Sequence, residues 1–385
     1  MTTLLQRSPE AWSEIGGLHT AEEIAQQPRL WRDLYARLCA ERGRVKGFLG
    51  DCLANPAQQV ILTGAGSSAF VGEIVADQLN AAWPAQVRAL ATTTLLTHPE
   101  LYLETGAPTL LVSFARSGDS PESLAAVHLV RDLVPGARLL NITCNPDGQL
   151  ARDSAPDADA FNLLMPAASC DRGFAMTSSF TCMLLAALAV LGKDVPFDRI
   201  GLLAGLGQQA MQAWEAPLAG LAAIEAGRVV YLGSGPLEGL ARESALKLLE
   251  LTAGRVPAIA NTPLGFRHGP KSVLTHDALV FVYGSSKALS QRYEADLVEE
   301  LRRDGVAGQV LAIGPHADIG AEDDHTLSVP VLEPALDDPW LAPVWLGFAQ
   351  LFALQRSAAL GLTPDNPFPD GTVNRVVQGV TIHHG

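Results

Sequence analysis

The sequence predicts an α/β protein that contains two tandem copies of one parallel-sheet unit, each flanked by helices. Short, nearly continuous apolar runs alternate with helical stretches from residue 60 onward, which is typical of a parallel sheet covered on both faces. The pattern then begins again, because RVVYLGSG at 228–235 restates VILTGAG at 60–66 with an offset of 169 residues (Val229 against Val60). We therefore predict one such domain over residues 51–200 and a second over residues 215–362.

Residues 1–50 form a predicted N-terminal helical segment. Thr20 and Glu23 have the spacing of a capping box, and Pro28 is expected to interrupt the chain before a second helix from Trp31 to Phe48. The role of this segment stays open, and packing against a partner subunit is one hypothesis.

The strands of the first domain are predicted at the apolar runs 60–66, 87–92, 109–115, 138–144 and 160–166. Helices are expected over 67–82, 121–134 and 177–191, and a helical connector over about 201–226. The strands of the second domain are predicted at 228–235, 256–261, 278–286, 309–315 and 325–332, followed by a long helix from Pro343 to Leu360. The tail, residues 363–385, is rich in Pro, Asn and Asp and is expected to wrap over a neighbouring surface.

The charge composition limits the kinds of ligand that the protein is expected to bind. The 385 residues include 27 Lys and Arg against 41 Asp and Glu, which gives a net charge of −14 without a basic run. Nucleic-acid binding requires clustered cations, so it is disfavoured. Anionic small molecules remain compatible with this charge, because helix N-termini bind phosphate.

The predicted compartment is a reducing cytoplasm. Five cysteines at positions 39, 52, 144, 170 and 182 form no C-x-x-C pair, so we expect buried thiols and neither a disulfide framework nor a zinc site. The N-terminus lacks the pattern of a signal peptide, and the longest apolar run, Cys182 to Leu191, is too short to cross a bilayer. We expect a soluble protein.

Three Gly- and Ser-rich loops follow predicted strands and open predicted helices. In open α/β sheets ligands bind outside the carboxyl ends of the strands, where N–H groups and hydroxyls at helix starts can hold an anion. One such loop alone is usually just a helix cap, but three on one sheet edge indicate anion binding. The candidate binding residues are Gly66, Ser67 and Ser68 in the first loop, Arg116, Ser117 and Ser120 in the second, and Ala175 and Thr177 in the third.

These loops do not have a nucleotide fingerprint. Ala69 stands at the spacing of the third dinucleotide-binding glycine, no acidic residue closes the strand near residue 90, and a Walker A motif is missing. Phosphate on a sugar fits better. Within the second loop, Ser120 is placed to N-cap a helix that begins at Pro121.

A charged helix face precedes a histidine loop in the second domain. Glu243, Lys247 and Glu250 are spaced i, i+4, i+7 and so share one face of a largely apolar helix. The spacing also fits a solvated row of ion pairs. His268 follows in a Gly- and Pro-bounded loop between two cations, where a structural histidine bonded to a carbonyl is the alternative.

Together these motifs resemble those of proteins with two sugar isomerase (SIS) domains, whose sheets are flavodoxin-like. The motifs are LTGAGSSAF, SFARSGDSPES, DRGFAMTSSF, YLGSG with ARESALKLLELTAG, GFRHGPKS and GTVNRVVQGVTIHH. They are similar to the isomerase half of glucosamine-6-phosphate synthase and closer to the bacterial galactosamine-6-phosphate deaminase/isomerase family, formerly called tagatose-6-phosphate ketose/aldose isomerases.

The resemblance implies roles for residues at matching positions. Ser68, Ser117 and Ser120 match the phosphate-binding hydroxyls, Glu250 matches the carboxylate that moves a proton between C1 and C2, and Lys247 matches its lysine neighbour. His268 matches the histidine that opens the sugar ring, which in the synthase comes from the partner subunit of a dimer. Glu243 is expected to be structural, paired with Lys247 or a helix end.

Departures from the synthase favour the deaminase family. Ala115-Arg116 replaces a Ser-Gln pair, Met176 replaces a serine, and the synthase's lysine near the C-terminus has no counterpart in NRVVQG. The spacing from Glu250 to His268 is also slightly longer. The glutaminase half is missing, so glutamine-derived ammonia is disfavoured as a nitrogen source.

The resemblance therefore implies conversion of D-galactosamine 6-phosphate to D-tagatose 6-phosphate and ammonia by a cytoplasmic homodimer or higher homo-oligomer. The reaction requires no cofactor or metal, and His383-His384 is expected to be a solvated tail. The alternatives are an aldose–ketose isomerase that releases no ammonia and a non-catalytic sugar-phosphate sensor. Retention of Glu250, Lys247 and His268 disfavours the sensor. The galacto or gluco configuration of the substrate stays open.

Overall fold

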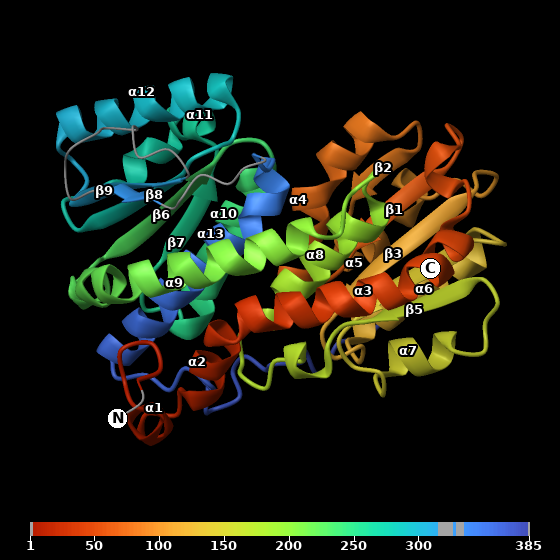
Figure 1. Cartoon of the computed structure of the whole chain (residues 1–385), viewed down its shortest axis with the longest axis horizontal. Helices are drawn as coiled ribbons and strands as arrows, with labels where there is room; N and C mark the ends of the chain where they lie inside the picture. The colour runs from red at the N-terminus through yellow and green to blue at the C-terminus, as the bar shows by residue number, and fades with distance from the viewer. Residues whose placement is uncertain (1–2, 315–325, 329–334, 384–385) are drawn as a thin grey trace. The chain divides into compact units, whose positions relative to one another are not determined.

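The computed structural model describes residues 3–314, 326–328 and 335–383, and the chain forms two compact units, each built around a parallel sheet (Figure 1). Unit 1 takes the N-terminal residues up to Pro28, then Arg172–Thr177 and Leu202–Pro369. Unit 2 takes Arg29–Asp171, Ser178–Gly201 and the tail from Asp370. Each unit therefore combines segments that are far apart in the sequence.

The sheet of unit 2 has the strand order β2-β1-β3-β4-β5, and all of its pairings are parallel. Gln59 lies opposite Gln86 on one side and Thr109 on the other, which sets the register at the start of the strands. This order is flavodoxin-like, as predicted. The strands are β1 (Gln59–Thr63), β2 (Gln86–Ala89), β3 (Thr109–Ala115), β4 (Arg138–Thr143) and β5 (Ala160–Leu164).

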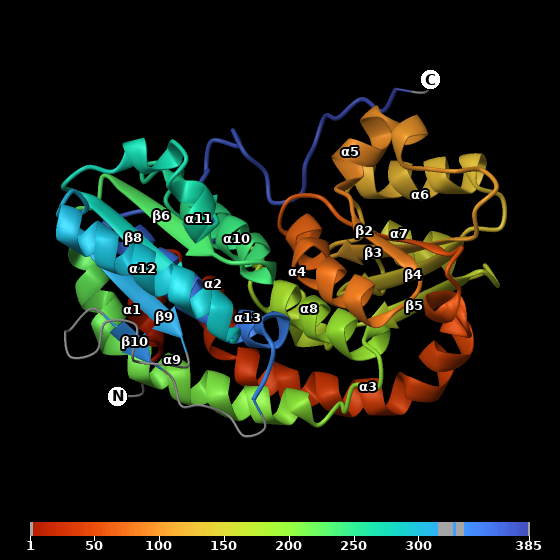
Figure 2. The ribbon, with the colours of Figure 1, turned by 90° about the horizontal axis from the view of Figure 1, so that it is seen from above.

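Helices cover both faces of this sheet (Figure 2). Ile61, Leu111 and Leu139 pack against apolar residues of α5 (Thr92–Thr97), α6 (Pro121–Leu133) and α7 (Gln149–Ser154). The alternate residues of the same strands point to the opposite face, because side chains alternate along a strand. That face meets α4 (Ser67–Ala82) and α8 (Ser178–Leu191), and α3 (Gln27–Leu49) joins α8 through a hydrogen bond of 3.1 Å from the Trp31 indole to the Thr181 hydroxyl.

The sheet of unit 1 repeats this topology. Its strand order is β10-β9-β8-β6-β7. Read from the other edge, this is β7-β6-β8-β9-β10, so the second strand, the first, the third, the fourth and the fifth follow one another as they do in unit 2. The two glycine-rich strand ends predicted that the second domain repeats the first. The shared strand order confirms this prediction. The strands are β6 (Arg228–Gly233), β7 (Ala258–Asn261), β8 (Ala278–Tyr283), β9 (Gln309–Gly314) and β10 (Thr326–Ser328).

The unit 1 sheet lies between two pairs of helices (Figure 1). Val230 and Val280 face α11 (Pro263–Phe266) and α12 (Ala288–Asp304) in one apolar cluster. On the other face the Phe281 ring makes edge contacts of 5.0 and 5.1 Å with Phe348 and Phe352 of α13 (Asp338–Ala359), which packs against α10 (Pro236–Leu251). Trp214 of α9 (Arg199–Ala223) meets Phe348 edge-on at 5.9 Å.

The predicted strands are all present where the structure describes the chain, although most end earlier than expected. The residues after the strands turn at once into loops and helices, so Gly64-Ala65-Gly66 does not belong to β1. The last predicted strand, 325–332, is described only at Thr326–Ser328, and its other residues lie outside the described ranges. Short 3₁₀ helices occur at Cys52–Ala54, Pro99–Leu101, Ala167–Ser169 and Pro270–Val273.

The predicted capping box at Thr20 and Glu23 is wrong. The helix α2 (Leu18–Ala25) begins after Gly17, so Thr20 lies inside its first turn. The carboxylate of Asp365 accepts hydrogen bonds from the N–H groups of His19 and Thr20, at 3.1 and 2.7 Å, and thereby supplies the cap from a distant segment. The predicted break near Pro28 is present, since α2 ends at Ala25 and α3 begins at Gln27, before the predicted start at Trp31. Pro28 occupies the second position of α3, where its missing N–H costs nothing. The helix α1 spans Pro9–Glu14.

The cysteine prediction holds only in part. All five thiols are free, and Cys144 and Cys182 are buried, but Cys39 is exposed on α3. Its position on the outward face of a long amphipathic helix explains the difference. None of the described helices has the length and apolarity that crossing a membrane requires.

Candidate active site

The first candidate loop is a tight turn from β1 into α4 in unit 2. Gly66 has φ of 56°, in the left-handed region that favours glycine, and Ser67 and Ser68 open the helix as buried residues. A Cβ on Gly64 would lie 2.5 Å from the Cβ of Ser68, so the strand and the helix start approach too closely for a side chain at residue 64. The two glycines thus place both serines at the carboxyl edge of the sheet.

The second loop, Arg116 to Ser120, follows β3 at the same edge and is held by the β4–α7 connection. The Asn145 side-chain amide donates to the carbonyl of Ser117 at 3.0 Å, and the Leu150 N–H donates to that of Gly118 at 2.9 Å. A Cβ on Gly148 would lie 2.2 Å from the Ser117 oxygen, so only glycine permits this approach. The loop is therefore fixed from outside before any ligand binds.

Ser120 occupies the N-cap position of α6, as predicted, but makes no cap hydrogen bond with its side chain. Its hydroxyl donates instead to the carboxylate of Glu122 at 2.7 Å. The predicted N-cap position of Ser120 and the helix start at Pro121 are therefore confirmed, while the Ser120 hydroxyl bonds to Glu122 and not to a backbone N–H.

Arg116 is buried and lies at the end of β3. Its guanidinium donates to the backbone carbonyl of Arg375 at 2.8 Å, and the Arg375 guanidinium in turn donates to the carbonyl of Asp171. These contacts join the second loop, the tail and the residue before the third loop within unit 2. The sequence analysis named Arg116 as a candidate anion-binding residue, and its contact with the tail could not be read from local sequence.

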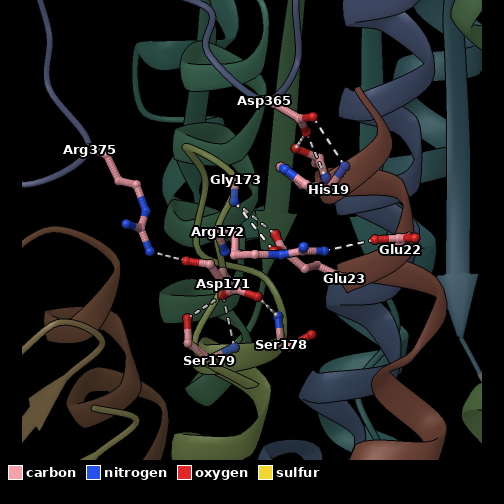
Figure 3. Close-up of polar contacts among 11 residues, drawn as sticks. His19, Glu22, Glu23, Asp171, Arg172, Gly173, Ser178, Ser179, Asp365 and Arg375 are labelled. Atoms are coloured by element: carbon pink, nitrogen blue, oxygen red, sulfur yellow. Dashed lines mark hydrogen bonds and ion pairs between the residues drawn. The ribbon is translucent and has the colours of Figure 1, made fainter. Parts of the chain in front are cut away.

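The third loop lies between Asp171 and α8 and begins with a carboxylate that sequence reasoning missed. The buried Asp171 accepts hydrogen bonds from the N–H groups of Ser178 and Ser179, at 3.0 and 2.9 Å, and also from the Ser179 hydroxyl (Figure 3). An acidic residue before a hydroxyl-rich helix start is a weak sequence signal for such a cap. Here Asp171 and Ser178 are seven residues apart, which is too far for the signal to be recognised from the local sequence. Ala175 and Thr177 are buried within the loop.

The predicted face of α10 in unit 1 carries a buried ion triad. The Lys247 ammonium is fully buried and lies 3.4 Å from a Glu243 oxygen, and it also donates to the Glu250 carboxylate. The side chain of Glu243 is likewise fully buried, whereas that of Glu250 is 23% exposed. The solvated-row alternative is therefore wrong. The structural pairing of Glu243 with Lys247 is confirmed, and Glu250 is the member of the triad that solvent reaches.

His268 lies in the exposed loop between α11 and the 3₁₀ turn at Pro270–Val273. Gly269 has φ of 111°, which only glycine adopts without strain, and it turns the chain directly after the histidine. Both flanking cations bind α12, since Arg267 lies 2.9 Å from Glu300 and Lys271 pairs with both Glu300 and Asp304. The loop is thus anchored on each side of the imidazole.

The same ion pairs shift the titration of the groups that form them. The hydrogen bond from Lys271 holds the pKa of Glu300 below its ordinary value of 4.5. Hydrogen bonds to Asp304 and then to Glu300 raise the pKa of Lys271 above 10.5. All three groups are therefore charged at neutral pH.

The equivalent loops of unit 1 are filled by carboxylates of the protein itself. Ser234, after β6, donates its hydroxyl to Glu294 at 2.6 Å, and Ser285, after β8, donates its N–H to the same carboxylate at 3.0 Å. The Ser285 hydroxyl donates to Asp338 at 2.6 Å. Burial raises the pKa of Glu294. Since these positions match the first two loops of unit 2, the loops of unit 2 are the better candidate for phosphate.

No family model matches the sequence, but full-length relatives do. An AgaS protein of Streptomyces coelicolor is 47% identical over 368 residues, which cover 95% of each chain. The D-galactosamine-6-phosphate deaminase AgaS of Escherichia coli is 45% identical over 377 residues, which cover 95% of this chain and 96% of its own. The chain belongs to the AgaS family.

A solved structure extends the AgaS likeness to the whole fold. The crystal structure of a Clostridium novyi protein, assigned to the tagatose-6-phosphate ketose/aldose isomerases, matches with a TM-score of 0.96 and 41% identity over 100% of both chains. The two-sheet SIS fold that the motifs implied is thereby confirmed. Within the described residues of this AgaS-family chain, no group of three or more His, Cys, Asp and Glu is placed to hold a metal ion.

Proposed function

We propose that this protein is a galactosamine-6-phosphate deaminase/isomerase that converts D-galactosamine 6-phosphate and water to D-tagatose 6-phosphate and ammonia. The observation that carries the proposal is the α10 triad, in which a buried lysine holds a solvent-accessible Glu250, in a chain 45% identical to an AgaS deaminase. A sensor would not require a carboxylate prepared in this way, because phosphate recognition alone would serve it.

In the proposed reaction His268 opens the sugar ring. The substrate exists mostly as a ring, so a proton must pass from O1 to O5, and an imidazole can both accept and donate one near neutral pH. The exposed loop position of His268 allows contact with a bound sugar. The product of this step is the open aldehyde, in which the hydrogen on C2 is acidic.

Glu250 then moves that hydrogen. We propose that its carboxylate takes the proton from C2 to form an enolamine and returns it to C1, which leaves an imine at C2. Water adds to the imine carbon, the C–N bond breaks, and ammonia and the ketose 6-phosphate leave. The Lys247 ammonium, in contact with Glu250, would orient the carboxylate or stabilise the oxyanion on O1.

The proposed phosphate site uses the serine loops of unit 2. Ser68, Ser117 and Ser120 would donate hydroxyls to the phosphate, and the helix N-terminus at Gly66 and Ser67 would add N–H groups. Ala175 and Thr177 are proposed sugar contacts. For Arg116, the bond to the Arg375 carbonyl favours a role in holding the loop and the tail together.

We also propose that the protein works in the cytoplasm as a homodimer or higher homo-oligomer, with His268 supplied by the partner subunit. The exposure of the anchored His268 loop supports a role for it in contacts with a second chain.

The deciding experiment measures ammonia and ketose released from galactosamine 6-phosphate and, separately, from glucosamine 6-phosphate. We expect equal amounts of ammonia and ketose from the galacto substrate and much less from the gluco substrate. Interconversion of unaminated sugar phosphates without ammonia release would favour the plain aldose–ketose isomerase. Tight sugar-phosphate binding with no turnover in any assay would favour the sensor.

A further inference from the structure

We propose that Glu23, on α2 of the N-terminal segment, is a positioning residue that holds the third loop in its binding conformation. The proposal rests on the proposed function, in which this loop contacts the substrate through Ala175 and Thr177. The segment before residue 50 has no role in the reaction as derived so far, yet its residues Glu22 and Glu23, which belong to unit 1, bind Arg172 and Gly173 of the same unit.

The central contact is a carboxylate that accepts two consecutive backbone N–H groups. Glu23 Oε1 lies 2.6 Å from the nitrogen of Arg172, and Glu23 Oε2 lies 3.2 Å from the nitrogen of Gly173 (Figure 3). The Glu23 side chain is only 3% exposed. A buried carboxylate is costly unless strong donors satisfy it, so the chain at 172–173 and Glu23 stabilise each other.

The space around Gly173 shows how closely the loop fits against α2. A Cβ at this position would lie 2.8 Å from the Thr20 hydroxyl oxygen and 3.0 Å from Glu23 Oε2. A side chain there would displace the Thr20 hydroxyl or the Glu23 carboxylate, which accepts the Gly173 N–H. Glycine at 173 is therefore explained by the approach of α2.

A second segment, which contains Asp365 and Phe368, also binds the start of the third loop. The carbonyl of Asp365 accepts the N–H of Phe174 at 3.1 Å, while the Asp365 carboxylate caps α2 through Thr20. The rings of Phe174 and Phe368 lie 5.3 Å apart. Residues 172–174 are thus held by backbone hydrogen bonds on both sides, and the next residues in the chain are Ala175 to Thr177. A loop fixed in advance pays less conformational entropy when the substrate binds.

The test compares Glu23→Gln with the matched control Glu22→Gln in the full-length enzyme. Glu22 makes an exposed ion pair of 2.8 Å with the Arg172 side chain and does not hold the backbone, so its removal should leave the KM within twofold. Glu23→Gln replaces one acceptor oxygen by an NH₂ group that faces a backbone N–H. We expect its KM for galactosamine 6-phosphate to rise about tenfold while kcat, measured per folded site, changes by less than about threefold.

A merely structural role for Glu23 would give a different result. It would lower the melting temperature and the yield of folded protein but leave the KM of the folded fraction equal to that of Glu22→Gln, and that outcome overturns the proposal. If Glu23→Gln does not fold, Gly173→Ala takes its place, because the added methyl should push the Glu23 carboxylate away from the backbone N–H groups that donate to it. A wild-type KM for Gly173→Ala would overturn the proposal equally.

Hydrogen exchange separates this proposal from the proposed function. The amides of Arg172 and Gly173 should be protected in the ligand-free wild type and should lose protection in Glu23→Gln but not in Glu22→Gln. Fast exchange of these amides in the ligand-free wild type overturns the positioning role whatever the substrate is. Absence of ammonia release by the wild type would contradict the proposed function and leave this exchange comparison to decide the role of Glu23.

Discussion

At the scale of single residues, the buried ion triad on α10 is the feature that ties sequence to chemistry. A lysine at 0% exposure between two carboxylates loses its hydration, and the ion pairs with these carboxylates help to compensate for that loss. Because Glu243 is also fully buried and Glu250 is not, the triad has a buried end and a solvent-accessible end. This asymmetry yields two predictions.

Replacing Glu250 by Gln should remove turnover while sugar-phosphate binding stays within a few-fold of wild type. The substitution deletes the base but keeps the size of the side chain and an oxygen that Lys247 can contact. Calorimetric titration with the sugar phosphate and a parallel ammonia assay measure the two quantities. Substantial ammonia release by the variant would show that another group is the base.

Replacing Lys247 by Met should lower the free energy of unfolding by about 3 kcal/mol, because Glu243 is left buried without its cationic partner. Urea denaturation followed by circular dichroism measures this change. The double variant Glu243→Gln with Lys247→Met is the control and should recover a substantial part of the loss. A single variant as stable as the wild type would contradict the structural role of the triad.

At the scale of elements, loops in this protein are held by helices that come from elsewhere in the chain. The β4–α7 connection fixes the second loop, α2 fixes the third, and α12 fixes the His268 loop through Glu300 and Asp304. Rigid elements thus determine where the loops lie.

The anchor on α12 should show in the pH dependence of stability. The pKa of Glu300 is lowered by the Lys271 hydrogen bond, so ionised Glu300 stabilises the folded state above its ordinary value of 4.5, and this contribution is lost as the pH falls through the lowered value. Wild type should therefore be more stable than Glu300→Gln at pH 7, and the difference should shrink below pH 4.5. Denaturant unfolding at pH 7, 4.5 and 3 measures it. A difference that is independent of pH would contradict the ion-pair role.

At the scale of the whole molecule, the two sheets share one topology but differ at their carboxyl edges. Glu294 and Asp338 bind the loops of unit 1 with hydrogen bonds of the kind that phosphate oxygens accept. The chain's own carboxylates thus occupy this edge of the unit 1 sheet, and we expect phosphate at the corresponding edge of the unit 2 sheet.

This asymmetry predicts one sugar phosphate per chain. Calorimetric titration of the Glu250→Gln variant, which should bind galactosamine 6-phosphate without turning it over, should give a stoichiometry near one. Ser68→Ala should weaken that single site, whereas Ser234→Ala should leave its affinity within about twofold, since Ser234 bonds to Glu294. Two equivalent sites per chain would contradict the prediction.

The proposed exchange of His268 between subunits can be tested with hybrid dimers. Co-expression of the inactive variants Glu250→Gln and His268→Asn should restore activity to about a quarter of wild type, because half of the dimers are hybrids and each hybrid has one intact site. Sites built within one chain would carry one defect each, and the mixture would stay inactive. Each variant expressed alone is the control.

Several features of this protein follow from the sequence by itself. Apolar runs of strand length with glycine-rich ends predicted the strands of both sheets, and the restated VILTGAG pattern predicted that the second sheet repeats the first. The spacing of Glu243, Lys247 and Glu250 placed them on one helix face. These predictions hold because strand and helix periodicity are local properties of the chain.

Tertiary structure alone decided the contacts between residues distant in the sequence. Asp365 caps α2 from 345 positions away, which made the local capping box wrong, and Glu23 holds Arg172 from a separation of 149 residues. The bond from Arg116 to the tail spans 259 positions. The burial of Lys247 likewise became evident only once α10 was packed in the fold. A backbone N–H or a buried charge takes whichever partner the fold brings within reach, and local sequence does not carry that information.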